Sequence, residues 1–597
     1  MLIPCFFYTK VKPLARKNIG YLLNVTNIVR EQVVYIILTI KQLYKKFIDP
    51  KNTRDMYFKG IVLVVIISIA FFAITINLKE SSEEKDYQED VFERYLDKVN
   101  QPQQLVAENI VNREHLLALY SQNHFELYWT KSYSPKELLK MVEDSRLHGL
   151  NPSDFNYEEI QEHVNLGLKS AQDYAILEAL VCDAFISIAN VLGNPHSEIN
   201  LVDTTWFFKE PVRKINNLFN IESIKDALLS AEKPAQYKSL MKGLNYLFVL
   251  QSAGGWKTDL TASKTIDPGY EGEKIVKIRT RLAKSGSYYG SFNSLVYDKG
   301  LEDAVKEFQK RHGLEPDGRI GKSTIAELNV SIEERIDQVK VNLERWRWLG
   351  EPEEDTYVMV NIPSYRLSII EEGLEVMNKK VIVGRPKRAT PVFKGFMQYM
   401  VINPHWSIPP TILKEDVFPE ASIDSTYLTS HDMYVMDFEG NPMEYKDVEW
   451  EFFTPETFPY IIRQSPSRTN SLGEMKFMFP NPYNIYIHDT PNKTLFSKEK
   501  RAFSSGCIRV EDPKDLVAYF LKLREDIDME KIDTILLKKE EYEHKTISIL
   551  GKTPVYITYF TSWVDENDHL YFYEDIYNRD KDYFNYVKYG KEIYSKL

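Results

Sequence analysis

Apolar and polar residues follow four different patterns along this chain of 597 residues. Residues 60–78 carry no charge at all. Residues 91–262 place apolar side chains at helical spacing, and residues 270–330 repeat that pattern in shorter pieces. From residue 352 onward the alternation has a period of two, which predicts strands. The chain is too long for one core, so we expect an α+β protein of several domains.

The first uncharged segment predicts a membrane anchor. Gly60–Leu78 has 19 residues, and as a helix it would span about 28 Å, the thickness of a bilayer core. Residues 1–59 contain eleven Lys/Arg and three Asp/Glu, whereas the linker 79–90 is mainly acidic. This balance predicts a basic cytoplasmic segment, a single-pass helix and an exported remainder. A cleaved signal peptide is the alternative, and Met56 is an alternative start to Met1.

The middle of the chain predicts helices in three groups. In the helical domain expected over 91–262, an apolar run surrounds Cys182, which we therefore expect in a core. Residues 270–330 predict a separate unit of three short helices, and residues 331–350 predict a connecting helix. The apolar stripe of the three-helix unit comprises Ile275, Ile278, Leu282, Leu301, Ala304, Val305 and Phe308.

The last part of the chain predicts a mostly β domain over residues 352–545. An aromatic and acidic stretch at 418–459 interrupts its alternation, which indicates an insertion. Residues 546–597 predict further strands and a tail, associated either with this domain or with the helical one.

Composition excludes several classes of protein. The three cysteines, Cys5, Cys182 and Cys507, lie in different predicted regions and form no disulfide framework. Neither CxxC nor HExxH occurs, so we expect no metal and no cofactor. Residues 61–597 carry 64 Lys/Arg against 83 Asp/Glu, a balance opposite to that of nucleic-acid-binding proteins.

The segment NIYIHDTPNKTLFSKEKRAFSSGCIRV carries the candidate chemistry. Strand alternation puts Tyr486 and His488 on one face. Gly506 permits a tight turn that presents the Cys507 thiol and leaves backbone N–H groups free. A thiol, an imidazole and free N–H donors are the parts of acyl transfer by a cysteine nucleophile. Without a wider pattern, however, a lone cysteine is usually a core residue.

The motifs HDTP and SSGCIRV resemble the signature of the L,D-transpeptidase family of bacterial cell-wall enzymes, as do VNIPSYRL and NPHWSIPP. Ser505 stands where many family members have histidine. AVKEFQKRHGLEPDGRIGKSTIAELN resembles a peptidoglycan-binding domain of three helices. LYWTK, HGLNPSDF and AGGW resemble the scaffold domain of the large multidomain members.

This resemblance implies roles for individual residues. Cys507 would be the nucleophile and His488 the base. The backbone N–H groups of Cys507 and Gly506 would form the oxyanion hole, and the Tyr486 hydroxyl would donate to substrate or oxyanion. The substrate-binding candidates are Arg509, Trp406, Ser505 and Thr490.

Two of these candidates have structural alternatives. Arg509 either pairs with a substrate carboxylate or forms an ion pair with Glu511 or Asp512. Trp406 either lines the cleft or packs in the core.

The resemblance also implies a reaction and a location. We expect 3→3 cross-linking of peptidoglycan stem peptides, through a thioester between Cys507 and the stem diamino acid and with release of D-alanine. Hydrolysis of the same bond by an L,D-carboxypeptidase, a noncatalytic peptidoglycan-binding anchor, and a lipoprotein lysine as acceptor are the alternatives. The partners would be stem peptides, glycan and the membrane, with carbapenem-type β-lactams as inhibitors. The catalytic part would face the periplasm or cell-wall space. The insertion 418–459 would be either a cap over the cleft or an ordinary surface insertion.

Overall fold

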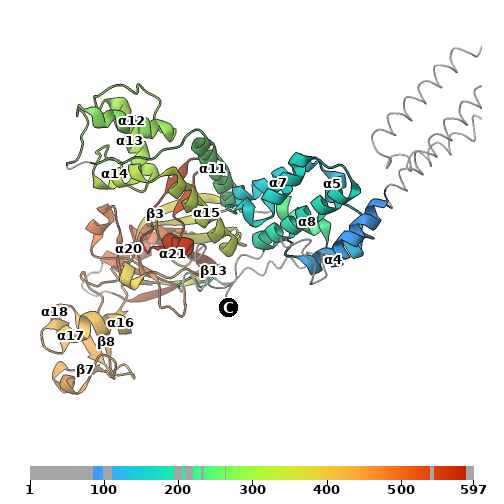
Figure 1. Ribbon diagram of the computed structural model, residues 1–597. Coiled ribbons are helices and arrows are strands. Elements are labelled where there is room, and N and C mark those ends of the chain that lie inside the picture. Colours follow the sequence, from blue (N-terminus) through green and yellow to red (C-terminus); the bar gives the residue numbers. More distant parts are fainter. Residues whose placement is uncertain are drawn as a thin grey trace, which may run out of the picture. The chain divides into compact units, whose positions relative to one another are not determined.

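The computed structural model describes residues 85, 87–97, 110–193, 205–208, 220–229, 234–261, 264–522, 524–537 and 543–585. The predicted basic segment, the predicted membrane anchor and most of the linker lie outside these residues. The chain divides into two compact units. One consists of Met1–Ala107, Tyr120–Tyr128 and Leu168–Glu178, and the other contains the remaining residues. Figure 1 shows the elements of both units.

The described part of the first unit is organised around one buried acid. The Glu178 carboxylate accepts hydrogen bonds from the Tyr120 hydroxyl at 2.6 Å and the Tyr128 backbone N–H at 2.7 Å. Phe92 packs edge-on against Tyr120, with ring centroids 4.7 Å apart. These contacts satisfy the carboxylate inside an apolar setting.

The predicted helical domain is confirmed. Cys182 lies in α8 and is fully buried, as expected from its apolar surroundings. Of the described helices, α8 has the length and composition to cross a membrane, but 72% of its apolar window is buried within the protein. The helices are α4 (Arg113–Ser121), α5 (Trp129–Ser132), α6 (Pro135–Glu143), η2 (Asp144–His148), η3 (Pro152–Asp154), α7 (Tyr157–Leu166), α8 (Ala171–Gly193), α10 (Ile221–Leu229) and α11 (Ala235–Ser252).

The three-helix unit is confirmed as α12 (Glu273–Lys284), α13 (Lys299–Arg311) and α14 (Lys322–Asn329). The predicted apolar stripe forms its core. The connecting helix is α15 (Ile332–Leu349), which begins at a capping box between Ser331 and Glu334.

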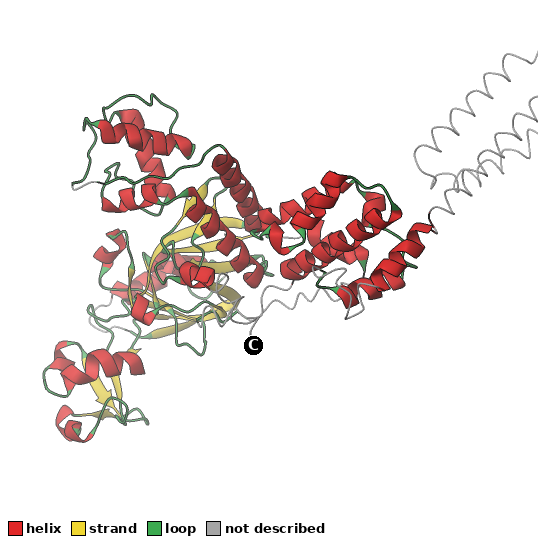
Figure 2. Cartoon of the chain, viewed as in Figure 1, coloured by secondary structure: helices red, strands yellow, loops and turns green. Residues whose placement is uncertain are grey.

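A closed sheet forms the centre of the predicted β domain. Its nine strands run in the order β11-β3-β12-β10-β9-β4-β13-β1-β2, and the pairing of β3 with β2 closes it. Helices cover it in Figure 2. The strands are β1 (Thr356–Asn361), β2 (Arg366–Glu371), β3 (Leu374–Gly384), β4 (Phe393–Ile402), β9 (Met475–Met478), β10 (Ile487–His488), β11 (Ala502–Ser504), β12 (Ile508–Val510) and β13 (Lys545–Thr558).

The sheet extends past residue 545, where the sequence placed the end of this domain. Strand β13 pairs in parallel with β1 and antiparallel with β4, so it is a central strand and not part of an appended tail. The hairpin of β14 (Ser562–Val564) and β15 (Leu570–Phe572) follows it. Helices α19 (Pro513–Leu521) and α20 (Met529–Leu537) bury apolar residues in the core of the sheet, and η4 (Pro386–Arg388) and η8 (Lys493–Ser497) lie in its loops.

The predicted insertion is a small subdomain with its own sheet, spanning Trp406–Gln464 and therefore wider than residues 418–459. Its strand order is β5-β8-β6-β7. It begins and ends where Trp406 pairs with Gln464. Its elements are β5 (Trp406–Ser407), α16 (Pro410–Ile412), η5 (Leu413–Val417), α17 (Phe418–Ala421), α18 (Tyr427–Ser430), β6 (Met433–Met436), β7 (Pro442–Met443), η6 (Tyr445–Asp447), η7 (Trp450–Phe452) and β8 (Ile461–Gln464).

A buried ion pair joins the connecting helix to α21 (Arg579–Asn585). Arg345 donates to Asp580 at 2.5 Å, with side chains 3% and 11% exposed. The second Asp580 oxygen accepts from Thr561 at 2.7 Å.

We expect Asp580→Ala to lower the free energy of unfolding by about 3 to 5 kcal/mol, because it leaves the Arg345 charge buried and unpaired. Asp533→Ala is the control, since its partner Lys514 and Asp533 itself are 50% and 47% exposed, and we expect a loss below about 1 kcal/mol. Urea unfolding of both variants measures the difference. Equal losses in the free energy of unfolding would contradict a larger stabilising contribution of the buried pair.

Candidate active site

The register of two short strands places the candidate residues on one face of the sheet. Strands β10 and β12 are parallel, with Ile487 opposite Ile508 and His488 opposite Arg509. Ile487 and Ile508 are fully buried in the core of the sheet. Side chains alternate along a strand, so Tyr486, His488, Cys507 and Arg509 lie on the opposite face. Cys507 therefore faces Tyr486, and His488 is its diagonal neighbour.

The loop before Cys507 is fixed by backbone contacts. Gly506 has a φ of 115°, a conformation that residues with a Cβ rarely adopt. Its carbonyl accepts from the Thr390 hydroxyl at 2.7 Å, and its N–H donates to the Ser504 hydroxyl at 3.2 Å. The expected oxyanion donor Gly506 is therefore already engaged. Within the described part of the chain, the Cys507 N–H donates no hydrogen bond to another backbone group.

The Cys507 thiol lies beside the Tyr486 ring. Its Sγ donates to the Asn484 carbonyl at 3.6 Å. Burial raises the pKa of Cys507 above its ordinary value of 9.0, and this effect is opposed by Tyr486, Lys476 and Arg509. The resting thiol is therefore protonated near neutral pH.

The His488 imidazole is buried and uncharged. Burial, followed by the charge of Arg509, lowers its pKa to about 3. The carbonyls of Asp489 and Leu472 oppose this shift, but Nδ1 has no partner that meets hydrogen-bond geometry. The Asp489 carboxylate does not orient the ring, because it binds the Glu474 N–H and Lys493. A neutral imidazole can accept a proton, as a general base must.

The other expected site residues have different surroundings. Arg509 forms no ion pair with Glu511 or Asp512 within the described residues, and its Nε is buried without a partner. Trp406 is 9% exposed and packs in the core of the small subdomain, where it hydrogen-bonds the Tyr486 side chain. It is thus both a core residue and a neighbour of the site.

Ser505 and Thr490 lie at the edges of this arrangement. Ser505 is exposed, and its hydroxyl accepts from Arg388 at 2.8 Å. Thr490 is 1% exposed, and its hydroxyl accepts from the Asn492 N–H at 3.2 Å in the turn that follows β10. Thr490 therefore shapes the loop after β10.

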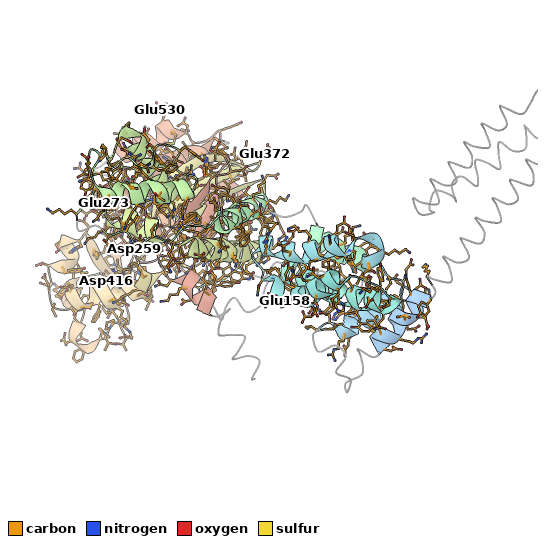
Figure 3. All side chains as sticks on the ribbon, turned by 45° about the horizontal axis from the view of Figure 1, so that its top comes forward. Glu158, Asp259, Glu273, Glu372, Asp416 and Glu530 are labelled. Carbon is orange, nitrogen blue, oxygen red and sulfur yellow. The ribbon has the colours of Figure 1, made fainter. Side chains whose placement is uncertain are left out.

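Two residues near the site were missed by the sequence reasoning. Lys476 on β9 pairs in register with His488, and its Nζ lies 3.9 Å from the centroid of the Tyr486 ring. Arg388 connects Ser505 to Glu415 and Asp416 of the small subdomain. Asp416 is labelled on that subdomain in Figure 3. A charged residue between the core residues Met475 and Phe477 was the available signal for Lys476.

The chain matches three known families in sequence. Residues 355–557 match the L,D-transpeptidase catalytic domain, residues 271–328 a peptidoglycan-binding domain, and residues 114–244 the scaffold domain. The first match contains every residue of the face described above. The chain carries an L,D-transpeptidase catalytic domain.

Individual proteins with similar sequence or fold can be compared with these matches. A Haemophilus influenzae protein whose name assigns it to the L,D-transpeptidases is 36% identical over 254 residues, which are 42% of this chain and 50% of the relative. The chain thus spans half the length of that protein. L,D-transpeptidase structures from Xylanimonas cellulosilytica and Stackebrandtia nassauensis are 14% and 16% identical. Their TM-scores are 0.15 and 0.19, over 50% of this chain and 100% and 97% of theirs. These scores are below 0.5, so the assignment rests on the sequence matches.

The protonation states of the pair predict how the free thiol reacts. We expect the rate of Cys507 alkylation by iodoacetamide to keep rising as the pH passes about 9, because burial raises the pKa of the thiol and only the thiolate reacts. Mass spectrometry of the peptide that contains Cys507 measures this rate. Cys182, which is fully buried, is the unlabelled control. A rate that is already constant from about pH 6 would indicate a preformed thiolate–imidazolium pair and contradict this description.

Proposed function

We propose that this protein is a cysteine-dependent acyltransferase, an L,D-transpeptidase that forms 3→3 cross-links in peptidoglycan. The observation that carries the proposal is the common face of Cys507, Tyr486 and His488, set by the parallel register of β10 and β12. The matches to a catalytic and a peptidoglycan-binding domain support the substrate class.

In the first half-reaction, Cys507 Sγ attacks the carbonyl of the third stem residue, a diamino acid, and His488 takes the thiol proton. The negative charge that develops on the carbonyl oxygen is stabilised by the Cys507 N–H and the Tyr486 hydroxyl. The bond to D-alanine breaks, and the leaving amine takes the proton from His488. A thioester on Cys507 remains.

In the second half-reaction, the side-chain amine of another stem attacks the thioester. His488 removes the proton from this amine, the acyl C–S bond breaks as the new amide forms, and the released Cys507 thiolate takes the proton from His488. His488 is unprotonated in the resting site, the state from which a general base starts each step. Water in place of the amine would give the carboxypeptidase reaction.

The small subdomain acts as the cap over this reaction. Its core contacts Tyr486 and Cys507, which are otherwise part of the main domain. A cover of this kind excludes water from the thioester and favours transfer to an amine. Arg388 holds the cap to the nucleophile loop through Asp416 at 2.7 Å and Ser505 at 2.8 Å.

The remaining domains position the catalytic domain at the wall. The segment 60–78 anchors the chain in the inner membrane, with its N-terminus in the cytoplasm and its catalytic part in the periplasm. The three-helix unit binds glycan, which retention on isolated sacculi tests.

Product analysis separates the alternatives. Incubation of the protein with tetrapeptide-stem fragments should give cross-linked dimers, and Cys507→Ala should abolish them, because no thioester can form. A carbapenem should block the same product by acylating Cys507.

Liquid chromatography with mass spectrometry identifies the fragments. Tripeptides without dimers would favour the carboxypeptidase. Neither product, together with retention on sacculi, would favour the noncatalytic anchor. A stem joined only to a lipoprotein lysine would assign a different acceptor.

Loosening the cap should shift the reaction towards water. We expect Arg388→Met to raise the ratio of tripeptide to dimer by about threefold or more, because the variant removes the contacts between cap and loop. Lys414→Met is the matched control. Its ion pair with Glu456 lies within the cap, with side chains 59% and 56% exposed, and the ratio should not change. An unchanged ratio in Arg388→Met would contradict the role of the cap.

A further inference from the structure

Lys476 is placed beside the nucleophile by the register of three strands. It lies opposite His488 on β10 and opposite Val401 on β4. Its neighbours Met475 and Phe477 are fully buried in the core of the sheet. Lys476 therefore points to the other face, which it shares with His488 and Cys507.

The Lys476 ammonium group contacts the aromatic residue that faces the thiol. Its Nζ lies 3.9 Å from the centroid of the Tyr486 ring, within the range of a cation–π interaction. Burial lowers the pKa of Lys476, and a negative charge on Cys507 opposes that shift.

Lys476 and Arg509 bring two positive charges to this face without an acid. The described part of the chain includes every residue of this face, and within it neither Lys476 nor Arg509 forms an ion pair. The nearby acids have other partners: Asp489 pairs with Lys493, and Glu415 and Asp416 pair with Arg388. Arg509 Nε and His488 Nδ1 are also buried without partners. Unpaired buried donors are costly, so this arrangement fits a site completed by an anionic ligand.

We propose that Lys476, together with Arg509, binds the free carboxylate of the amino acid that leaves during acylation. This inference rests on the proposed function. In such a donor the carboxylate carbon is three bonds from the attacked carbonyl carbon, within about 4 Å of it. A cation beside Tyr486 and Cys507 is therefore within reach of this group. Lys476 is thus a specificity-determining residue. It selects donors in which a single amino acid with a free carboxylate follows the bond that is broken.

The test compares two donors that differ in one group. Tetrapeptide donors are prepared with a free terminal carboxylate and with a terminal amide, and kcat/KM is measured for each. The wild-type protein should favour the free acid. Lys476→Met should lower the rate with the acid by about 10- to 100-fold, the usual effect of a charge-assisted hydrogen bond, and change the rate with the amide far less. Lys476→Arg should retain the preference.

A lysine outside the site provides the matched control. Lys500 is 62% exposed and pairs with Glu574, and Lys500→Met should leave both rates unchanged. Equal losses with acid and amide in Lys476→Met would overturn the inference, because they would indicate a structural or general electrostatic role. A wild-type protein without preference between the donors would also overturn it.

A second measurement does not depend on turnover. N-acetyl-D-alanine should slow alkylation of wild-type Cys507 by iodoacetamide, and its amide should not. Lys476→Met should lose this protection. If the wild-type protein turns over neither donor but shows the protection, the proposed function fails and the carboxylate site stands. If the acid gives no protection and donor preference is absent, the site is overturned.

Discussion

The parallel pairing of β10 with β12 is the constraint on which the candidate active site depends. Only four backbone positions set it, yet a shift of β12 by one residue against β10 would turn Cys507 towards the core and Ile508 towards the face of His488. The two isoleucines are fully buried. Their burial therefore fixes the direction of the thiol and the imidazole, and the packing of the domain and its chemistry share one determinant.

The electrostatics of the site follow from that placement. Burial holds both the thiol and the imidazole neutral at rest, since it raises the pKa of Cys507 and lowers that of His488 to about 3. Lys476 and Arg509 then supply positive charge on the same face, and no acid among the described residues forms an ion pair with either of them. The thiol and imidazole thus form no preformed ion pair, and the two cations are the groups on which the proposed carboxylate site and the proposed acyl transfer draw.

Much of this could be predicted from the sequence, and the omissions have a common cause. Helical periodicity located the scaffold helices and the three-helix unit, and local motifs predicted Cys507 and His488 as the candidate catalytic residues. Contacts between distant segments were not accessible in the same way. Strand β13 belongs to the main sheet only because β1 and β4 pair with it, and Arg388 reaches Ser505 across 117 positions. The position of Lys476 opposite His488 follows only from the pairing of β9 with β10.

The central claim is that Cys507 carries the acyl group and that His488 moves the proton. Mass spectrometry of the protein incubated with a tetrapeptide donor and no acceptor tests this most directly. The account predicts a tripeptidyl adduct on the peptide that contains Cys507, and its formation should be slower by about 100-fold or more in His488→Gln. An adduct on another residue, or equal rates in the two proteins, would contradict it.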